Sequence, residues 1–355
     1  MVLRAVSHIE AYVGNSFQAA HFYRTAMGFT PVAYAGPETG VKSCASYVLQ
    51  RGDVRIVLTS PVSATSDVNC HFQRHGEGVR DIALAVDDAR AAFEEAVRRG
   101  ARPVREPYEA EDLSGRVVFS QIAAFGDTVH TFVERGDFRG RFLPFYRDLE
   151  PLPAADTGLC GIDHFAVSVE EGGAERWARH YESVLGLETS REEDIATEYS
   201  AMFSKVVQSR DRRAIFVFVE PASGKRKSPI AEYLAFYDGP GVHHVALSTK
   251  DIIASVRALR GHGVRFMQTP RAYYDRLPSR VGLIGESIDE LSELGILVDR
   301  DENGYLMQIF SQPVQSRPTF FFEIIQREGA QGFGSGNIKA LFEAIERAQL
   351  ERGNA

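Results

Sequence analysis

Two adjacent histidines, His243 and His244, stand in the apolar, β-branched segment Gly241–Leu247. Such a segment is typical of a buried strand, and consecutive side chains of a strand point to opposite faces. We therefore expect only one of the two histidines to bind a given metal ion. A carboxylate, Glu323, stands in the equally apolar segment Phe320–Ile325, where burial is costly unless the group is paired or binds a metal.

A third candidate ligand, His164, begins the strand-like segment 164–169. Two imidazoles and one carboxylate leave an octahedral metal three open positions, as in non-haem Fe(II) enzymes that activate oxygen. Zinc is the general competitor for such a donor set. Each residue also has a simpler interpretation, because an isolated His164 is more commonly a hydrogen-bonded core histidine and Glu323 could form a salt bridge with an arginine.

One pattern of elements occurs twice along the chain, and such a repeat indicates a duplicated unit. The matching segments, first half before second, are 8–13 and 164–169, 22–29 and 180–187, 78–88 and 241–251, 96–104 and 259–267, and 129–135 and 319–327. The second pair ends in a glycine where a helix C-cap is expected, and the fourth pair reads as a helix, a glycine and a strand. The order β-α-β-β-β is therefore predicted twice in each half.

The aligned positions of the two halves differ in chemistry. Where the second half has His164, His244 and Glu323, the first half has His8, Asp81 and Thr131. A full ligand set in one copy and a broken set in the other indicate duplication followed by loss. The repeat therefore favours His244 over His243 as the metal ligand.

Length and composition predict two globular domains. The chain has 355 residues, and the proline-rich stretch 150–153 is the expected linker between domain 1–150, without metal, and domain 151–355, with metal. The net charge of −8 disfavours nucleic acid or an anionic membrane as a partner.

The three widely separated cysteines form no disulfide framework or zinc motif. Lacking a run of ~20 apolar residues and a signal-peptide profile, the chain is expected to be cytoplasmic.

Longer motifs after residue 155 carry a resemblance that covers almost the whole chain. They are Gly161–His164, Glu220–Pro221, Ile230–Leu234, Gly241–His244, Asp299–Phe310, Arg317–Ile325 and Gly332–Phe342. In these motifs the chain resembles the family of 4-hydroxyphenylpyruvate dioxygenase and hydroxymandelate synthase, in the vicinal oxygen chelate superfamily. The resemblance implies an α+β fold of two tandem vicinal-oxygen-chelate domains, each of paired βαβββ modules forming an open β-barrel. It also implies a C-terminal lid helix at 332–353.

The resemblance implies Fe(II) bound by His164, His244 and Glu323, and a small-molecule 2-oxo acid and O2 as reaction partners. The keto acid chelates the iron, and its oxidative decarboxylation precedes hydroxylation of the same molecule. Hydroxylation of the ring gives homogentisate in the dioxygenase, whereas hydroxylation of the benzylic carbon gives 4-hydroxymandelate in the synthase. A homodimer or homotetramer is also expected from the family.

Pocket positions follow from the same resemblance. Ser204 matches a pocket serine of the family, Gln308 matches a glutamine near the substrate, and Phe310 and Phe321 match its aromatic walls. Without the resemblance, the two phenylalanines would be read equally well as ordinary core residues. Asn337 belongs to the lid motif.

Four positions depart from the pattern usual in the dioxygenase. Val219 replaces an asparagine before Glu-Pro, and Ile338 replaces a phenylalanine in the lid motif; the synthase also has aliphatic residues at both places. Pro229 and His243 replace two glutamines. The loss of two amides predicts weaker recognition of a phenolic hydroxyl, unless His243 restores the contact.

These patterns favour an Fe(II)-dependent 2-oxo-acid dioxygenase acting on an arylpyruvate-like substrate, with hydroxylation at the benzylic carbon. Ring hydroxylation of 4-hydroxyphenylpyruvate and action on a non-phenolic 2-oxo acid are the alternatives within the family. A ring-cleaving extradiol dioxygenase would share the triad but not the C-terminal lid. A non-catalytic binding protein of the same superfamily would be expected to have lost the metal ligands.

Overall fold

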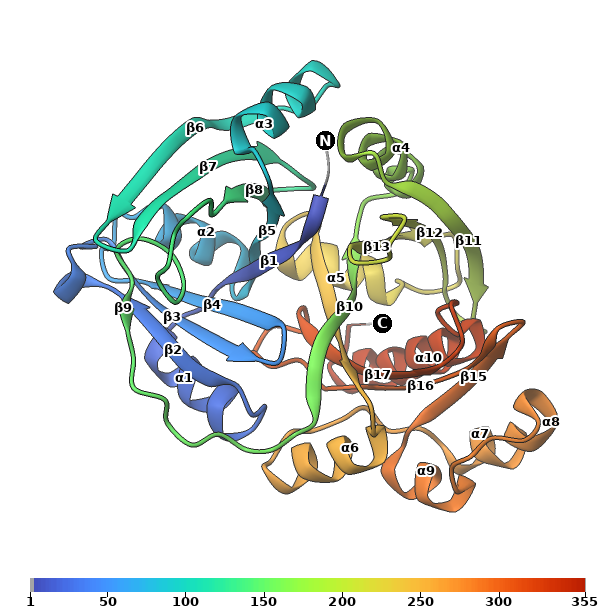
Figure 1. Ribbon diagram of the computed structural model, residues 1–355. Coiled ribbons are helices and arrows are strands. Elements are labelled where there is room, and N and C mark those ends of the chain that lie inside the picture. Colours follow the sequence, from blue (N-terminus) through green and yellow to red (C-terminus); the bar gives the residue numbers. More distant parts are fainter. Residues whose placement is uncertain (1–2, 355) are drawn as a thin grey trace.

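The computed structural model describes residues 3–354 as two strongly curved β-sheets that lie side by side, each with helices on its outer side (Figure 1). The first sheet has nine strands in the order β6-β7-β8-β5-β1-β4-β3-β2-β9. The second has eight strands in the order β11-β12-β13-β10-β14-β17-β16-β15. The chain between β9 and β10 joins the two sheets and passes below α1 in the view of Figure 1.

The first domain contains two modules in succession. The first module consists of β1 (Leu3–Tyr12), α1 (Ser16–Thr25), β2 (Thr30–Ala35), the short 3-10 helix η1 (Pro37–Thr39), β3 (Cys44–Arg51) and β4 (Val54–Pro61). After α2 (Asp67–His75), the second module consists of β5 (Gly78–Val86), α3 (Ala89–Arg98), β6 (Pro103–Asp112), β7 (Gly115–Ala123) and β8 (Val129–Glu134). The two-residue strand β9 (Arg147–Asp148) pairs with β2 and completes the sheet.

The second domain repeats this order. Its first module consists of β10 (Leu159–Ser168), α4 (Gly173–Leu185), β11 (Glu188–Ala196), β12 (Ala201–Gln208) and β13 (Ile215–Ala222), and α5 (Pro229–Tyr237) follows it. Its second module consists of β14 (Gly241–Thr249), α6 (Ile252–Gly261), α7 (Arg271–Asp275), α8 (Leu277–Val281), α9 (Ile288–Leu294), β15 (Leu297–Asp301), β16 (Gly304–Phe310) and β17 (Phe321–Glu328). The chain then forms α10 (Ser335–Glu351).

The predicted α+β fold of tandem βαβββ modules is confirmed. In each sheet the first strands of the two modules, β1 with β5 and β10 with β14, pair antiparallel at the centre. The repeat extends to the helix caps: Asp88 accepts the backbone N–H of Ala91, and Asp251 accepts that of Ala254, both at 2.9 Å. An aspartate at this position starts the helix after the central strand in both domains.

One predicted element is wrong. The strand expected at the end of 259–267 is absent, since Phe266 forms only an isolated bridge with Ser311, and three short helices follow before β15. The equivalent first-domain segment does lead into β6. Gly186 is the C-cap of α4, as expected, whereas Gly28 lies two residues beyond the C-cap of α1, Ala26.

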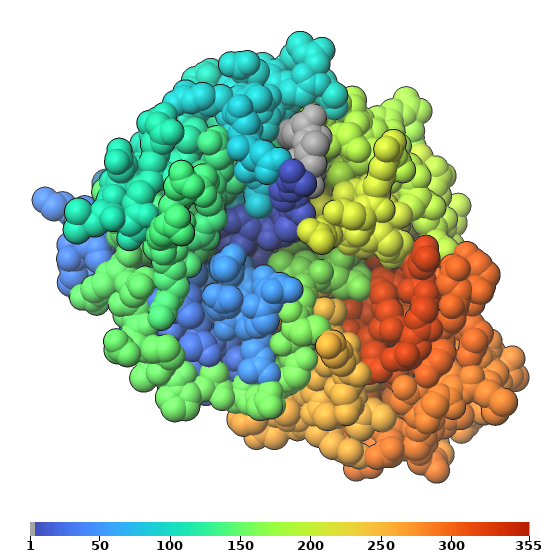
Figure 2. All heavy atoms as spheres, in the orientation of Figure 1, coloured from blue at the N-terminus to red at the C-terminus, as the bar shows by residue number. Residues whose placement is uncertain are grey.

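The two domains share one hydrophobic core, and the space-filling view shows them in contact along the middle of the molecule (Figure 2). At this interface, buried His130 of β8 lies 2.6 Å from the hydroxyl of Tyr181 on α4. His130 Nδ1 donates to the carbonyl oxygen of Ile82 at 2.8 Å, so Nε2 is free to accept from the tyrosine. The boundary at 150/151 stays a prediction.

We expect Tyr181→Phe to lower the free energy of unfolding by about 1–3 kcal/mol, because it leaves a buried imidazole nitrogen without its donor. Chemical denaturation followed by circular dichroism measures the loss. Tyr199→Phe is the control, since half-buried Tyr199 lies under the guanidinium of Arg226 and away from this interface. Equal stability of Tyr181→Phe and the control would contradict the assignment.

Candidate metal centre and substrate pocket

Three neighbouring strands bring the predicted triad together. His164 of β10 and Glu323 of β17 both pair with Ala246 of β14, from its two sides, and His244 lies two residues before Ala246. Because residues two apart on a strand share a face, all three side chains project to the same side of the sheet. They are 3%, 7% and 1% exposed, respectively.

The three side chains converge on one point. One ligand atom from each lies within 4.8 Å of the others, and Glu323 Oε2 is 3.3 Å from the Nε2 atoms of both His164 and His244. Two donors bound at ~2.1 Å to one ion, at angles between octahedral and tetrahedral, lie ~3.0–3.4 Å apart. The spacing of these donors therefore fits a divalent metal ion.

The electrostatics of the triad also fit a cation. Burial by itself would lower the pKa of His164, but the carboxylates of Glu323 and Asp163 outweigh it and raise the pKa to about 9. Burial opposes ionisation of Glu323, yet the two imidazoles lower its pKa to about 2. Burial lowers the pKa of His244 despite its contact with Glu323. At neutral pH the triad thus holds one proton, on His164, where a metal would replace it.

Further residues orient His164. Asp163 Oδ1 lies 2.7 Å from His164 Nδ1, and both oxygens of Asp163 accept from Arg327, at 2.7 and 2.8 Å. Such a carboxylate fixes the tautomer of a metal-binding imidazole and leaves Nε2 for the metal. The arginine of this strand therefore pairs with Asp163 and not with Glu323, which rules out the simpler interpretation of Glu323 as half of an arginine salt bridge.

The second imidazole contacts its sequence neighbour. His243 Nδ1 lies 3.4 Å from His244 Nδ1, so His243 reaches the ring nitrogen that faces away from Glu323. The His243 ring packs edge-on against Tyr233 and Phe321, and burial lowers its pKa well below the usual value. His243 is thus a neutral side chain beside the triad and is not one of the three converging residues.

The carboxylate of Glu323 is connected to the C-terminal helix. Gln308 Nε2 donates to Glu323 Oε1 at 2.7 Å, and Asn337 of α10 donates to Gln308 Oε1 at 2.8 Å. The hydroxyl of Tyr273, on α7, in turn donates to Asn337 Oδ1 at 2.6 Å. Tyr273 was not predicted from the sequence, because it lies in the helical insertion and carries no motif. Arg280 of α8 also donates to the Tyr273 hydroxyl.

A small, largely apolar pocket of about 40 Å³ adjoins the triad. Of the predicted substrate-binding residues, it is lined by Ser204, Val219, His243, Gln308, Phe310 and Ile338. Most of the remaining lining is apolar and includes three residues that the sequence did not single out, Phe333 and, on α10, Leu341 and Phe342. Asn337 is fully buried and contacts Gln308.

A larger cavity of about 530 Å³ lies next to this pocket, between β14, α5 and α10. Pro229, Phe321 and His243 line it, so His243 and Phe321 separate it from the triad. Pro229 occupies the first position of α5, where its fixed backbone angle suits a helix start. The predicted residues thus divide between two adjoining spaces.

The first domain lacks an equivalent centre. In the first sheet Asp81 pairs with Val129, two residues before Thr131. In the second sheet His244 pairs with Phe321, two residues before Glu323. The sequence alignment of these positions therefore holds in the sheets. Thr131 donates its hydroxyl and its backbone N–H to Asp81. Burial raises the pKa of Asp81 to about 7. Within residues 3–354, these positions and His8 form no metal-type cluster.

Comparison with known proteins agrees with the fold and with the family that the sequence resembles. Residues 7–119 and 161–309 each match the Glyoxalase/Bleomycin resistance protein/Dioxygenase superfamily. The chain is 40% identical to 4-hydroxyphenylpyruvate dioxygenase of Yarrowia lipolytica, over 99% of this chain and 93% of the relative. It is also 40% identical to the Dictyostelium discoideum enzyme, over 99% and 100%. A triple variant of 4-hydroxymandelate synthase from Streptomyces coelicolor has the same fold, with a TM-score of 0.87, 36% identity, and coverage of 98% and 100%.

The fold and the buried two-histidine, one-glutamate centre define a two-domain dioxygenase of the glyoxalase and dioxygenase superfamily. Within it, the chain belongs to the 4-hydroxyphenylpyruvate dioxygenase family. It is accordingly an enzyme of the non-haem iron dioxygenase type, with a small-molecule substrate and O2. None of the helices within residues 3–354 is long and apolar enough to cross a membrane.

We expect Glu323→Ala to abolish both divalent-metal binding at the triad and turnover, because it removes the only carboxylate among the converging donors of the triad. Metal content after dialysis and oxygen uptake measure the two effects. Asp81→Asn is the matched control, since Asp81 occupies the equivalent central strand of the other domain. An unchanged metal content together with retained activity in Glu323→Ala would remove Glu323 as a ligand.

Metal binding should release about one proton per ion at pH 7, because only His164, with its pKa raised to about 9, holds a proton that the metal must displace. Below that pKa the apparent affinity should fall about tenfold for each pH unit. Calorimetric titration in buffers of different ionisation enthalpy measures the proton count. An affinity that does not change between pH 7 and 9 would refute this assignment.

Proposed function

We propose that the chain is an Fe(II)-dependent 2-oxo-acid dioxygenase that oxidatively decarboxylates an arylpyruvate-like substrate and hydroxylates it at the benzylic carbon. The observation that carries the proposal is the convergence of His164, His244 and Glu323 beside an apolar pocket. Fe(II) at this centre supplies the positions that a chelating keto acid and O2 require. The relatives named 4-hydroxyphenylpyruvate dioxygenase support the reaction type.

The residues around the centre hold the ligands and exclude water. Asp163 keeps His164 in the tautomer that presents Nε2, and Gln308 occupies the second oxygen of Glu323, so the carboxylate offers one oxygen to the metal. Phe310 and Phe333 enclose the same space with aromatic carbon. An apolar site of this kind strengthens polar contacts and limits side reactions with water.

The C-terminal helix serves as the lid in this proposal. The pocket of about 40 Å³ has room for about three waters, each needing ~10–15 Å³, but not for an aromatic keto acid. Ile338, Leu341 and Phe342 of α10 fill part of the remaining space. Movement of α10, which Arg352 ties to Glu232 at 2.6 Å, would enlarge the pocket and open it toward the adjoining cavity.

Two aliphatic residues favour hydroxylation of the side chain over the ring. Val219 and Ile338 both line the pocket. The family resemblance implies that the ring-hydroxylating enzyme usually has an asparagine and a phenylalanine at these two positions. An isoleucine leaves more space than a phenylalanine, so the aromatic ring of the substrate can settle where the benzylic carbon faces the metal. The likeness to a 4-hydroxymandelate synthase structure supports this outcome.

Ring hydroxylation to homogentisate is the second candidate, because the 4-hydroxyphenylpyruvate dioxygenases share 40% identity with nearly the whole chain. A third candidate is action on a non-phenolic 2-oxo acid, and Pro229 and His243 favour it. Both line the larger cavity, and neither offers the amide that a phenol would contact. The homodimer or homotetramer remains a proposal drawn from the family.

The iron-loaded enzyme should consume O2 with 4-hydroxyphenylpyruvate and give 4-hydroxymandelate, identified by mass spectrometry. Phenylpyruvate and aliphatic 2-oxo acids complete the substrate panel. Homogentisate as the main product would overturn the proposed regiochemistry, and no oxygen uptake with any 2-oxo acid would overturn the reaction class. Ile338→Phe should move the product ratio toward homogentisate, whereas Leu350→Phe, at a position of the same helix that is 50% exposed, should leave it unchanged.

A further inference from the structure

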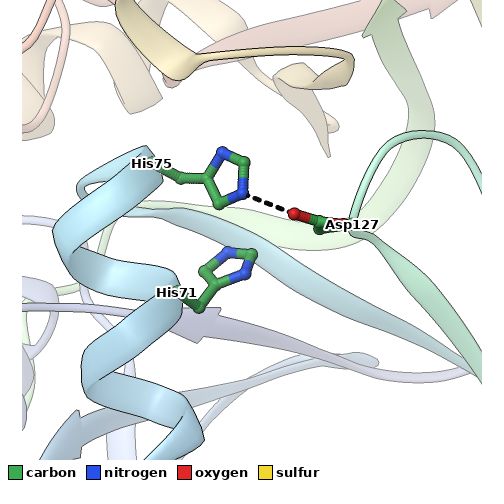
Figure 3. A group of neighbouring side chains, drawn as sticks. All are labelled: His71, His75 and Asp127. Carbon is green, nitrogen blue, oxygen red and sulfur yellow. Dashed lines mark hydrogen bonds and ion pairs between the residues drawn. The ribbon is translucent and has the colours of Figure 1, made fainter.

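A second group of metal-type side chains lies in the first domain, outside the pocket described above. His71 and His75 of α2 point from one face of the helix toward Asp127, in the turn between β7 and β8 (Figure 3). One donor atom from each of the three lies within 4.8 Å of the others. Histidines four residues apart on a helix share a face, which is a spacing that metal sites use.

His75 is held in the orientation of a metal ligand. Its Nδ1 donates to the backbone carbonyl of Tyr237, at the end of α5, at 2.5 Å. Its Nε2 is therefore the nitrogen with a free lone pair in the neutral ring, and this nitrogen lies 2.9 Å from Asp127 Oδ2. Two acceptors at this distance repel each other unless a proton or a metal ion joins them. A backbone carbonyl on the second nitrogen is the usual outer partner of a metal-bound histidine.

His71 supplies an independent observation. Its Nε2 is buried and has no hydrogen-bond partner within the described part of the chain, residues 3–354. A buried polar atom without a partner is rare and indicates a missing ion, water or ligand. Its ring centre lies 4.4 Å from that of His75, and burial lowers the pKa of His71 to about 3, so its imidazole is neutral at physiological pH.

The surroundings give access but also carry positive charge. A cavity of about 590 Å³, lined by all three residues, connects the cluster to solvent. Arg74 pairs with Asp127 at 2.8 Å and with Asp238 at 2.6 Å, and Arg80 donates to the carbonyl of Asp127. Two carboxylates thus face Arg74, and the exposed half of Asp127 remains open to water.

We propose that His71, His75 and Asp127 form a second divalent-metal site of the zinc type, with water completing the coordination. Two neutral imidazoles and one carboxylate are a usual donor set for Zn²⁺. The site would join α2 and the β7–β8 turn of the first domain. Through the hydrogen bond from His75 to Tyr237 it would also fix the end of α5 in the second domain.

Zn²⁺ binding to the metal-stripped protein tests the proposal. Wild type should bind two ions per chain, and both His71→Ala and Glu323→Ala should bind one. Because His71 Nε2 makes no hydrogen bond within residues 3–354, His71→Ala breaks none at this atom, and the variant should fold normally. His262→Ala, which removes an exposed helix-end histidine, should still bind two ions. A single ion in wild type that is lost with Glu323→Ala, or two ions in His71→Ala, would overturn the second site.

A stability measurement separates the second site from the catalytic centre. In Glu323→Ala, excess Zn²⁺ should raise the melting temperature, because a ligand that binds only the folded state stabilises it. The rise should disappear when Asp127→Asn or His71→Ala is added, and a persistent rise in both would overturn the proposal. Loss of a residue that binds Zn²⁺ directly should weaken Zn²⁺ binding by more than ~10–100-fold, which is the loss typical of a residue that only hydrogen-bonds to a ligand. Turnover of the iron-loaded enzyme should not change in His71→Ala.

Discussion

The contact between the buried Glu323 carboxylate and two imidazoles governs the organisation of the second domain. A carboxylate that is 1% exposed would be strongly destabilising in an apolar strand unless a positive charge lay beside it. His164 carries that charge as a proton in the metal-free protein, with its pKa raised to about 9 by the carboxylates of Glu323 and Asp163. The same arrangement that tolerates the proton could hold a divalent cation in its place.

Hydrogen bonds extend from this carboxylate to the surface of the domain. Gln308, Asn337 and Tyr273 link Glu323 to α10 and to the helical insertion before β15. Helix α10 is therefore held by polar contacts to the triad as well as by the apolar side chains that it places in the pocket. The proposed opening of α10 would break the contact between Asn337 and Gln308, and access to the pocket would then be coupled to the surroundings of Glu323.

The first domain has kept the scaffold and lost the centre. Its central strands have the register of the second domain, but Asp81 and Thr131 there satisfy each other by hydrogen bonds. This domain supports the second through a shared core and through polar contacts such as that between His130 and Tyr181. The proposed site on α2 lies at the same boundary, where a metal would add a further connection.

The sequence by itself determined the duplicated modules, the three side chains that converge and their counterparts in the first domain, because strand periodicity and repeat spacing are local properties of the chain. It did not determine the partners of those ligands: that His243 contacts His244, or that Tyr273 reaches Asn337. The helical insertion also replaced a strand expected from the repeat. Such contacts join segments far apart in the chain or depend on side-chain direction, so only packing of the tertiary structure decided them.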